Sequence, residues 1–394
     1  MKTFNILLIC FTLSFTTLRA QNTTNKGEKK IMEAGVDFLG KHEYAQFREQ
    51  NVIRTNSGRV VVIAQGRDIS EWPDRSGQDL VCKWSDDSGK TWSELQLVSE
   101  HGKQSICPNA SVYDAVNNRI FTLYNLFLWP YDDAQSRKTM EGSECKQFLV
   151  YSDDEGNTWS MPKEISHFMK TNKSPVIFGS GEGIQLKNSK NTGRLIIPGG
   201  DQRENRFVYA IYSDDFGETW KCGENVQNPN NLNVACETAM EKLSNGNLIL
   251  LSRSFGHKMK SFSSDGGSSW LPFSQDTSLV EISCNTGLLS FRYNNQDLLV
   301  TSFPAGPEPE NNNGEYVKEL PAGKRRVNGV LYVSFDNGKS WPVKKVVTKK
   351  RFAYSSLIQL SNGNLGLFYE SVLHWRGSYK NIHFNEINIA ELLK

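Results

Sequence analysis

The stretch Ser85-Asp86-Asp87-Ser88-Gly89-Lys90-Thr91-Trp92 is the first of five copies of one eight-residue pattern. Each copy reads S-x-D-x-G-x-[TS]-W, and the others occupy residues 152–159, 213–220, 263–270 and 334–341. The copies follow β-rich segments at intervals of 50 to 71 residues, which is typical of stacked β units such as propeller blades. Asp and Ser favour a tight turn, Gly permits a backbone conformation that other residues resist, and Trp can pack the turn between neighbouring sheets.

The segments between these copies predict six blades. A turn residue followed by a β-rich strand occurs six times, always after another apolar segment, which indicates six hairpins. Their second strands are expected at residues 60–64, 120–124, 195–198, 248–252, 298–302 and 365–369. Five hairpins lead into a third strand and the repeated turn, and the last lacks the turn, as a closing blade would. We therefore predict an all-β fold, a six-bladed propeller of four-stranded antiparallel blades over residues 44–394.

The first 20 residues have the pattern of a secretory signal peptide. Lys2 precedes an apolar stretch at residues 6–15, and small residues end near Ala20. The apolar stretch is shorter than the roughly 20 residues that a membrane span needs. We expect an exported protein, in a periplasm, on a cell surface or in the medium, with residues 21–43 as a lead segment before the propeller.

Charge and cysteine content exclude some classes of partner. Removal of residues 1–20 takes Lys2 and Arg19 from the 45 basic residues and no acid, which leaves 43 basic against 43 acidic residues. A formal charge of zero argues against a nucleic-acid-binding protein. The six cysteines that remain after loss of Cys10 permit disulfides without requiring them. No C-x-x-C pair is present, which argues against a zinc site.

Strand direction predicts which residues share a face. In an antiparallel blade, the start of the first strand, the end of the second and the start of the third lie at one end. The repeated turn between the third and fourth strands lies at the other end, which makes it a structural device. The charged and phenolic residues expected at the first end are Arg48, Arg67, Asp74, Glu237, Arg253, Arg326, Tyr354 and Glu370.

This constellation fits an anion receptor. Arg48, Arg253 and Arg326 come from three blades, and convergent guanidiniums bind a carboxylate well because each offers paired donors in a fixed fork. An acid such as Glu370 beside one of them would offset their mutual repulsion. Each of these residues alone would be an ordinary surface residue, and only their joint placement favours a site.

These motifs resemble the exo-sialidases (neuraminidases) of the secreted and lysosomal type over residues 44–385. The repeats resemble that family's Asp boxes. Phe47-Arg48 with Gly66-Arg67 is similar to its F/Y-R-I-P segment and following E-G-R, and Cys236-Glu237 with Arg253 to its N-E segment and next arginine. The run from Arg326 to Ser334 resembles its third arginine strand. Tyr354-Ser-Ser-Leu with Tyr369-Glu370 resembles its Y-S-D-L and Y-E.

The resemblance implies a role for each site residue. Arg48, Arg253 and Arg326 would bind the sialic acid carboxylate, and Glu370 would orient Arg48. Tyr354 would be the nucleophile and Glu237 its base, because a neutral phenol is not repelled by the carboxylate on the anomeric carbon. Arg67 would contact substrate. Asp74 would be the acid/base, with Asp68 and Asp79 as alternatives. The chemistry requires no metal or other cofactor.

Two departures from the family pattern bear on the site. The first motif is Phe47-Arg48-Glu49-Gln50, and loss of Ile and Pro is expected to change local rigidity. Asp68 is closer to Arg67 than the family's acid, and Asp74 is slightly farther.

The implied partners are sialylated glycans, and we expect a monomer. Two further functions fit the same residues, a non-catalytic Asp-box propeller that binds sialylated glycans or a protein, and a trans-sialidase.

Overall fold

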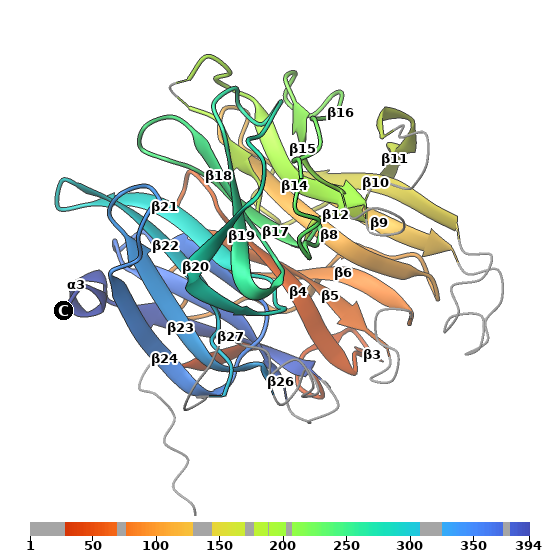
Figure 1. The fold of residues 1–394 in the computed structure, drawn as a ribbon. Helices are drawn as coiled ribbons and strands as arrows, with labels where there is room; N and C mark the ends of the chain where they lie inside the picture. Colours follow the sequence, from red (N-terminus) through yellow and green to blue (C-terminus); the bar gives the residue numbers. More distant parts are fainter. Residues whose placement is uncertain are drawn as a thin grey trace, which may run out of the picture.

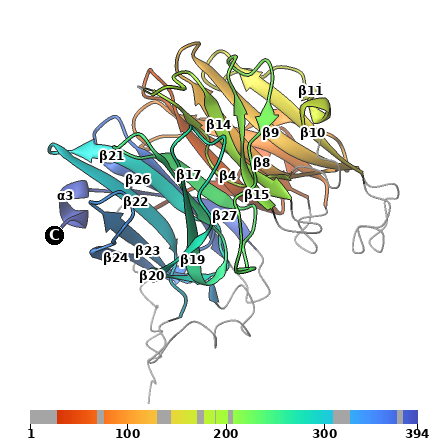
Figure 2. The same ribbon diagram turned by 45° about the horizontal axis from the view of Figure 1, so that its top comes forward.

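The computed structural model describes residues 28–68, 76–128, 144–169, 177–187, 189–201, 207–307, 325–372 and 379–394. Six antiparallel sheets lie around a common axis (Figure 1), as predicted. In Figure 2, the blade of β21 to β24 lies on the opposite side of this axis from the blade of β8 to β11.

The blades follow one another in chain order, with the first strand innermost. The first blade contains β4 (Gln46–Arg54), β5 (Val60–Arg67), β6 (Gln78–Ser85) and β7 (Gln96–Ser99). The second contains β8 (Ser105–Asp114), β9 (Arg119–Leu128), β10 (Glu144–Ser152) and β11 (Lys163–Glu164). In the third, β12 (Ile177–Phe178) and β13 (Ile184–Gln185) both pair with β14 (Leu195–Asp201), followed by β15 (Phe207–Ser213) and β16 (Lys221–Cys222).

The remaining blades repeat this order. The fourth contains β17 (Thr238–Lys242), β18 (Leu248–Ser252), β19 (Phe255–Ser263) and β20 (Ser274–Ile282). The fifth contains β21 (Gly287–Tyr293), β22 (Gln296–Pro304), β23 (Val327–Ser334) and β24 (Val343–Arg351). The sixth contains β25 (Ser355–Gln359), β26 (Leu365–Val372), β27 (Tyr379–Ile387) and β1 (Lys29–Glu33). Outside the blades lie a hairpin of β2 (Phe38–Leu39) and β3 (His42–Glu43), a 3-10 turn η2 (Ser166–Phe168) and a short helix α3 (Ile389–Leu392).

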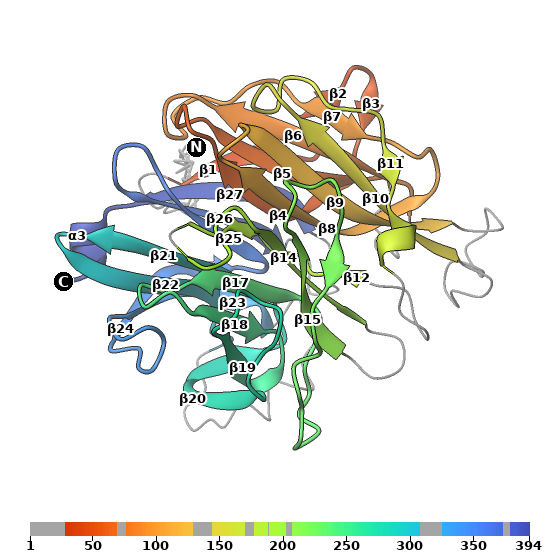
Figure 3. The same ribbon diagram turned by 90° about the horizontal axis from the view of Figure 1, so that it is seen from above.

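An N-terminal strand completes the last blade. β1 pairs antiparallel with β27, with Met32 opposite Ile382, and the two lie side by side in Figure 3. The sequence analysis placed these residues in a lead segment and expected no strand there. Because both ends of the chain meet in one sheet, the sixth blade closes the ring by backbone pairing.

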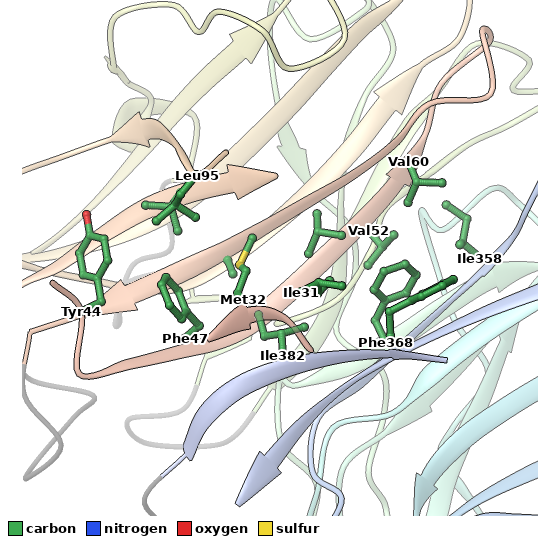
Figure 4. Close-up of a cluster of buried hydrophobic side chains, with 14 of the residues drawn as sticks. Ile31, Met32, Tyr44, Phe47, Val52, Val60, Leu95, Ile358, Phe368 and Ile382 are labelled. Carbon is green, nitrogen blue, oxygen red and sulfur yellow. The ribbon is translucent and has the colours of Figure 1, made fainter. Parts of the chain in front are cut away.

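Apolar clusters fill the spaces between blades. Figure 4 shows the cluster between the sixth and first blades, where Phe47 and Val52 of β4 lie near Phe368 and Ile382. A comparable cluster lies between each other pair of neighbouring blades. The core is therefore a ring of interfaces, and each sheet is buried on both sides.

The five Asp boxes adopt one hydrogen-bonded turn. In the first, Asp87 accepts hydrogen bonds from Ser85 Oγ at 2.8 Å and from the backbone N–H of Thr91 at 2.9 Å. Gly89 has a φ of 87° and donates its N–H to Ser85 Oγ at 2.8 Å. The same contacts recur in the other four copies. Trp92 packs edge-on against Phe384 of the neighbouring blade, as predicted for a residue that holds adjacent sheets together.

Candidate active site

Seven of the eight predicted site residues are described, and they lie at the end of the propeller opposite the Asp boxes. Arg48 lies on β4, Arg67 ends β5 and Glu370 lies on β26. Glu237 directly precedes β17, Arg253 follows β18, Arg326 precedes β23 and Tyr354 precedes β25. The pairing of Gln46 with Arg67, and of Arg67 with Gln78, confirms the strand directions from which this face was deduced.

A buried ion pair fixes the first arginine. Arg48 Nε and Nη2 donate to the two carboxylate oxygens of Glu370 at 3.3 and 3.2 Å. Glu370 is fully buried and also accepts the backbone N–H of Glu49 at 2.7 Å. This carboxylate therefore orients Arg48 and offsets its charge within the protein interior.

Arg253 joins the two residues expected to act together. Its Nη1 donates to the Tyr354 hydroxyl at 2.9 Å and forms an ion pair with the Glu237 carboxylate. Burial, reinforced by the Glu237 charge, raises the pKa of Tyr354 well above its usual value, although Arg253 and Arg326 oppose this shift. Burial alone would raise the pKa of Glu237, but Arg253 and the Tyr354 hydroxyl outweigh it and the pKa lies below its usual value. The resting site thus holds a neutral phenol beside a charged carboxylate.

Two further guanidiniums flank the tyrosine ring. The guanidinium carbons of Arg48 and Arg326 lie 5.1 and 5.2 Å from the centroid of Tyr354. With Arg253 on its hydroxyl, Tyr354 has three cationic groups around it from the first, fourth and fifth blades. The arrangement can bind an anion directly beside a phenolic oxygen.

Arg67 is held by a second carboxylate, that of Glu49. It is fully buried, and its Nε donates to Gln65 at 3.0 Å while its Nη2 contacts Glu49 at 2.9 Å. The sequence analysis did not single out Glu49 as a site residue. The sequence feature that could have indicated Glu49 is its position after Arg48, where the family's F-R-I-P pattern has Ile and this chain has a carboxylate.

Glu49 and Gln50 form a β-bulge in β4. The register with β5 shifts between Arg48 and Asn51, and Glu49 has a φ of 53°. Gln50 donates from Nε2 to the backbone carbonyl of Tyr354 at 3.0 Å, and Glu49 accepts from Ser180 Oγ at 2.9 Å. Hydrogen bonds from this segment therefore reach the sixth blade, at Tyr354, and the loop that carries Ser180.

The structure describes two of the three candidate acids, Asp68 and Asp79. Asp74 lies outside the described residues. Asp68 Oδ1 lies within hydrogen-bonding distance of His42 Nε2, at 3.0 Å, and Asp79 accepts a hydrogen bond from the Tyr44 hydroxyl at 2.7 Å. Burial raises the pKa of Asp79 to about 6.

One connecting residue that the sequence analysis missed contacts two of the arginines. Ser283 follows β20 and accepts hydrogen bonds from both Arg253 and Arg326. Only its position in the chain could have indicated Ser283. It lies in the connection from the last strand of one blade to the first strand of the next blade, and such connections return to this face.

Within the described ranges, no group of three or more His, Cys, Asp or Glu side chains could hold a metal ion, and the six cysteines there form no disulfide. Among the helices described, none is long and apolar enough to cross a bilayer.

Fold and site together define an Asp-box propeller with an arginine-lined anion site. The family described as BNR repeat-like domain matches residues 74–367. The chain belongs to this family, and within it to the sialidases (neuraminidases).

Sequence relatives agree with this assignment, and a solved structure agrees with the fold. A sialidase of Micromonospora viridifaciens is 27% identical over 365 residues, covering 87% of this chain and 53% of that protein. A sialidase of Bacteroides fragilis is 24% identical over 396 residues, covering 94% and 67%. The structure of the intramolecular trans-sialidase from Ruminococcus gnavus superposes with a TM-score of 0.74 at 18% identity, covering 92% and 98%. This chain spans about half the length of the Micromonospora enzyme.

Proposed function

We propose that the chain is an exo-α-sialidase that removes terminal sialic acids from glycoconjugates with retention of configuration. The observation that carries the proposal is the contact of Arg253 with both Tyr354 and Glu237, between the guanidiniums of Arg48 and Arg326. An anion receptor built around a phenol suits a sugar whose anomeric carbon bears a carboxylate.

Substrate binding would use the three arginines. The carboxylate of the sugar would accept hydrogen bonds from Arg48, Arg253 and Arg326, and Glu370 would keep Arg48 aligned. This holds the anomeric carbon near the hydroxyl of Tyr354. Arg67 is proposed to contact the substrate as well.

The chemical step would use the matched pair of phenol and carboxylate. Because the pKa of Tyr354 is raised and that of Glu237 is lowered, full transfer of the proton before attack is unfavourable. We expect the proton to pass to Glu237 while the bond between the phenolic oxygen and the anomeric carbon forms. The glycosidic bond breaks in the same step, and Asp74 is proposed to protonate the leaving oxygen. Asp74 would then deprotonate a water that attacks the anomeric carbon, while the bond from this carbon to the Tyr354 oxygen breaks and Glu237 returns its proton to that oxygen.

A fluorogenic aryl α-sialoside tests this function. We expect release by the wild-type chain and a loss in kcat of about 1,000-fold or more in Tyr354→Phe, because the nucleophile is removed. Tyr332→Phe is the matched control, since Tyr332 is equally buried on β23 but stacks on Phe303, away from the site. No release by a folded wild-type chain would overturn the proposal and favour a binding propeller.

The product of a natural substrate distinguishes hydrolysis from transfer. Incubation of a sialylated oligosaccharide followed by mass spectrometry should give free sialic acid. A leech relative at 25% identity over 62% of this chain is an anhydrosialidase, so an anhydro sugar as the main product would assign transfer instead.

A further inference from the structure

One serine links two of the three arginines in the proposed carboxylate receptor. Ser283 lies in the connection between β20 and β21, and its hydroxyl accepts the Nε–H of Arg253 at 3.0 Å. Its backbone carbonyl accepts from Arg326 Nη2, also at 3.0 Å. These arginines come from neighbouring blades, so Ser283 sets their positions relative to each other.

The backbone of Ser283 adopts a conformation that most residues avoid. Its φ of 67° lies in the left-handed region, which a side chain with a Cβ enters only when its surroundings require it. This conformation allows the hydroxyl and the carbonyl of one residue to face two different guanidiniums. Strain of this kind tends to occur where a structure supports function.

A buried ion pair holds the next residue from both sides. The N–H of Cys284 donates to Glu281 Oε1 at 2.7 Å, and its carbonyl accepts from Lys258 Nζ at 3.1 Å. Lys258 on β19 and Glu281 on β20 form an ion pair, and both are fully buried. The Cys284 side chain packs with Ala353 and Tyr354. The charged pair therefore fixes a backbone segment that touches both the arginines and the phenol.

The cost of this pair suggests a role other than stability. Transfer of two charges from water to a protein interior is costly, and well-packed apolar residues are often at least as stabilising. A flexible arginine side chain also gains precision when its hydrogen-bond partners are held in place. Both considerations favour a positioning function for the pair.

We propose that Ser283 is a positioning residue of the carboxylate receptor and that the Lys258–Glu281 pair braces it. The inference rests on the proposed sialidase function, because the arginines have their role there. Ser283 acts through Arg253 and Arg326 and does not itself contact the reacting atoms. Its loss should weaken recognition of the substrate carboxylate while the remainder of the sugar is bound as before.

The test compares two ligands that differ only in the carboxylate. An unsaturated sialic acid analogue and its methyl ester are titrated into the full chain. The dissociation constant of the ester divided by that of the free acid measures how strongly the carboxylate is recognised. In Ser283→Gly, which tolerates the left-handed backbone but lacks the hydroxyl, we expect this ratio to fall by about 10- to 100-fold, as for a lost hydrogen bond to a charged group. Affinity for the ester should be unchanged, and KM for the aryl sialoside should rise more than kcat falls.

A second variant tests the brace. In Lys258→Met/Glu281→Leu both charges are removed together, so neither is left buried without its partner. We expect the same fall in the ratio. The control Ser278→Gly removes an exposed serine of β20 whose hydroxyl contacts Asp276, and it should keep the wild-type ratio.

The outcomes separate this inference from the proposed function. A wild-type chain that neither cleaves the sialoside nor prefers the carboxylate ligand overturns both. An active wild type with an unaltered ratio in Ser283→Gly or in the double variant overturns the positioning role alone. If the double variant fails to fold, the ratio measured for Ser283→Gly alone decides whether Ser283 is a positioning residue. If Ser283→Gly loses the same affinity for both ligands, Ser283 has a general structural role, and this result would also overturn the positioning role.

Discussion

The two ends of the propeller use charged residues in opposite ways. At the Asp-box end, each aspartate bonds residues two to four positions away, as Asp87 does with Ser85 and Thr91. At the site end, the contact between Arg48 and Glu370 spans 322 positions, and that between Arg253 and Tyr354 spans 101. The box carboxylates are at least partly open to solvent, whereas Glu370 is fully buried.

This difference separates a repeated structural element from a site assembled once. A box needs only its own eight residues and a neighbouring blade for its tryptophan, so it can recur without change. The site needs the whole ring, because its residues come from several blades and contact each other only after closure. Removing one carboxylate should therefore have unequal consequences at the two ends.

The largest effect is expected for Glu370→Gln. This change removes one partner of a buried ion pair, so we expect the free energy of unfolding to fall by about 3 kcal/mol. The misplaced guanidinium should lower kcat/KM for the aryl sialoside by about 100-fold. Denaturant titration and steady-state kinetics measure the two losses.

The matched change at the box end is Asp336→Asn. The amide oxygen can still accept from Ser340 and Ser334, so the loss in stability should be at most about 1 kcal/mol, with unchanged kinetics. Equal losses in the two variants would contradict the contrast between the ends.

The next effect concerns the packing of a box against its neighbouring blade. A Cβ on Gly89 would lie 2.4 Å from the Phe384 ring, whereas one on Gly363 would meet nothing within 4 Å. Both glycines have a positive φ, of 87° and 86°. We expect Gly363→Ala to cost about 1 kcal/mol for backbone strain and Gly89→Ala about 1–3 kcal/mol more for overpacking. Similar urea midpoints for the two variants would show that the box is not tightly packed on the sixth blade.

The fold could be predicted from the sequence because its determinants are local and repeated. The boxes and hairpins gave the number of blades and the strand order, and strand direction then gave the face of the site. β1 was missed because Lys29–Glu33 resembles no repeated unit, and its partner β27 lies about 350 positions away.

The site could be predicted only in part. Family motifs drew attention to Tyr354, Glu237 and the arginines, and the structure brings these residues together. Their roles, and that of Asp74, remain predictions. The contacts of Glu49 and Ser283 depend on left-handed backbone conformations in non-glycine residues, which neither spacing nor composition indicates. Arg67 reaches the expected face, where it forms an ion pair with Glu49, a partner that the sequence did not indicate.

The smallest effect is a dependence of stability on acid pH that originates in the boxes. The hydrogen bond from the Thr91 N–H, with those from the Thr91 and Ser85 hydroxyls, lowers the pKa of Asp87 to about 2. An aspartate whose pKa is lower in the folded than in the unfolded state stabilises the fold above its unfolded value of about 4. That contribution is lost as the pH falls from about 4 towards 2. Asp87→Asn keeps one acceptor oxygen, for Ser85 Oγ and the Thr91 N–H, but cannot titrate. Its urea midpoint should therefore fall less than that of the wild type between pH 5 and pH 3. An unchanged pH dependence would mean that exposure to solvent screens this carboxylate, and that the boxes hold their turns by geometry without help from charge.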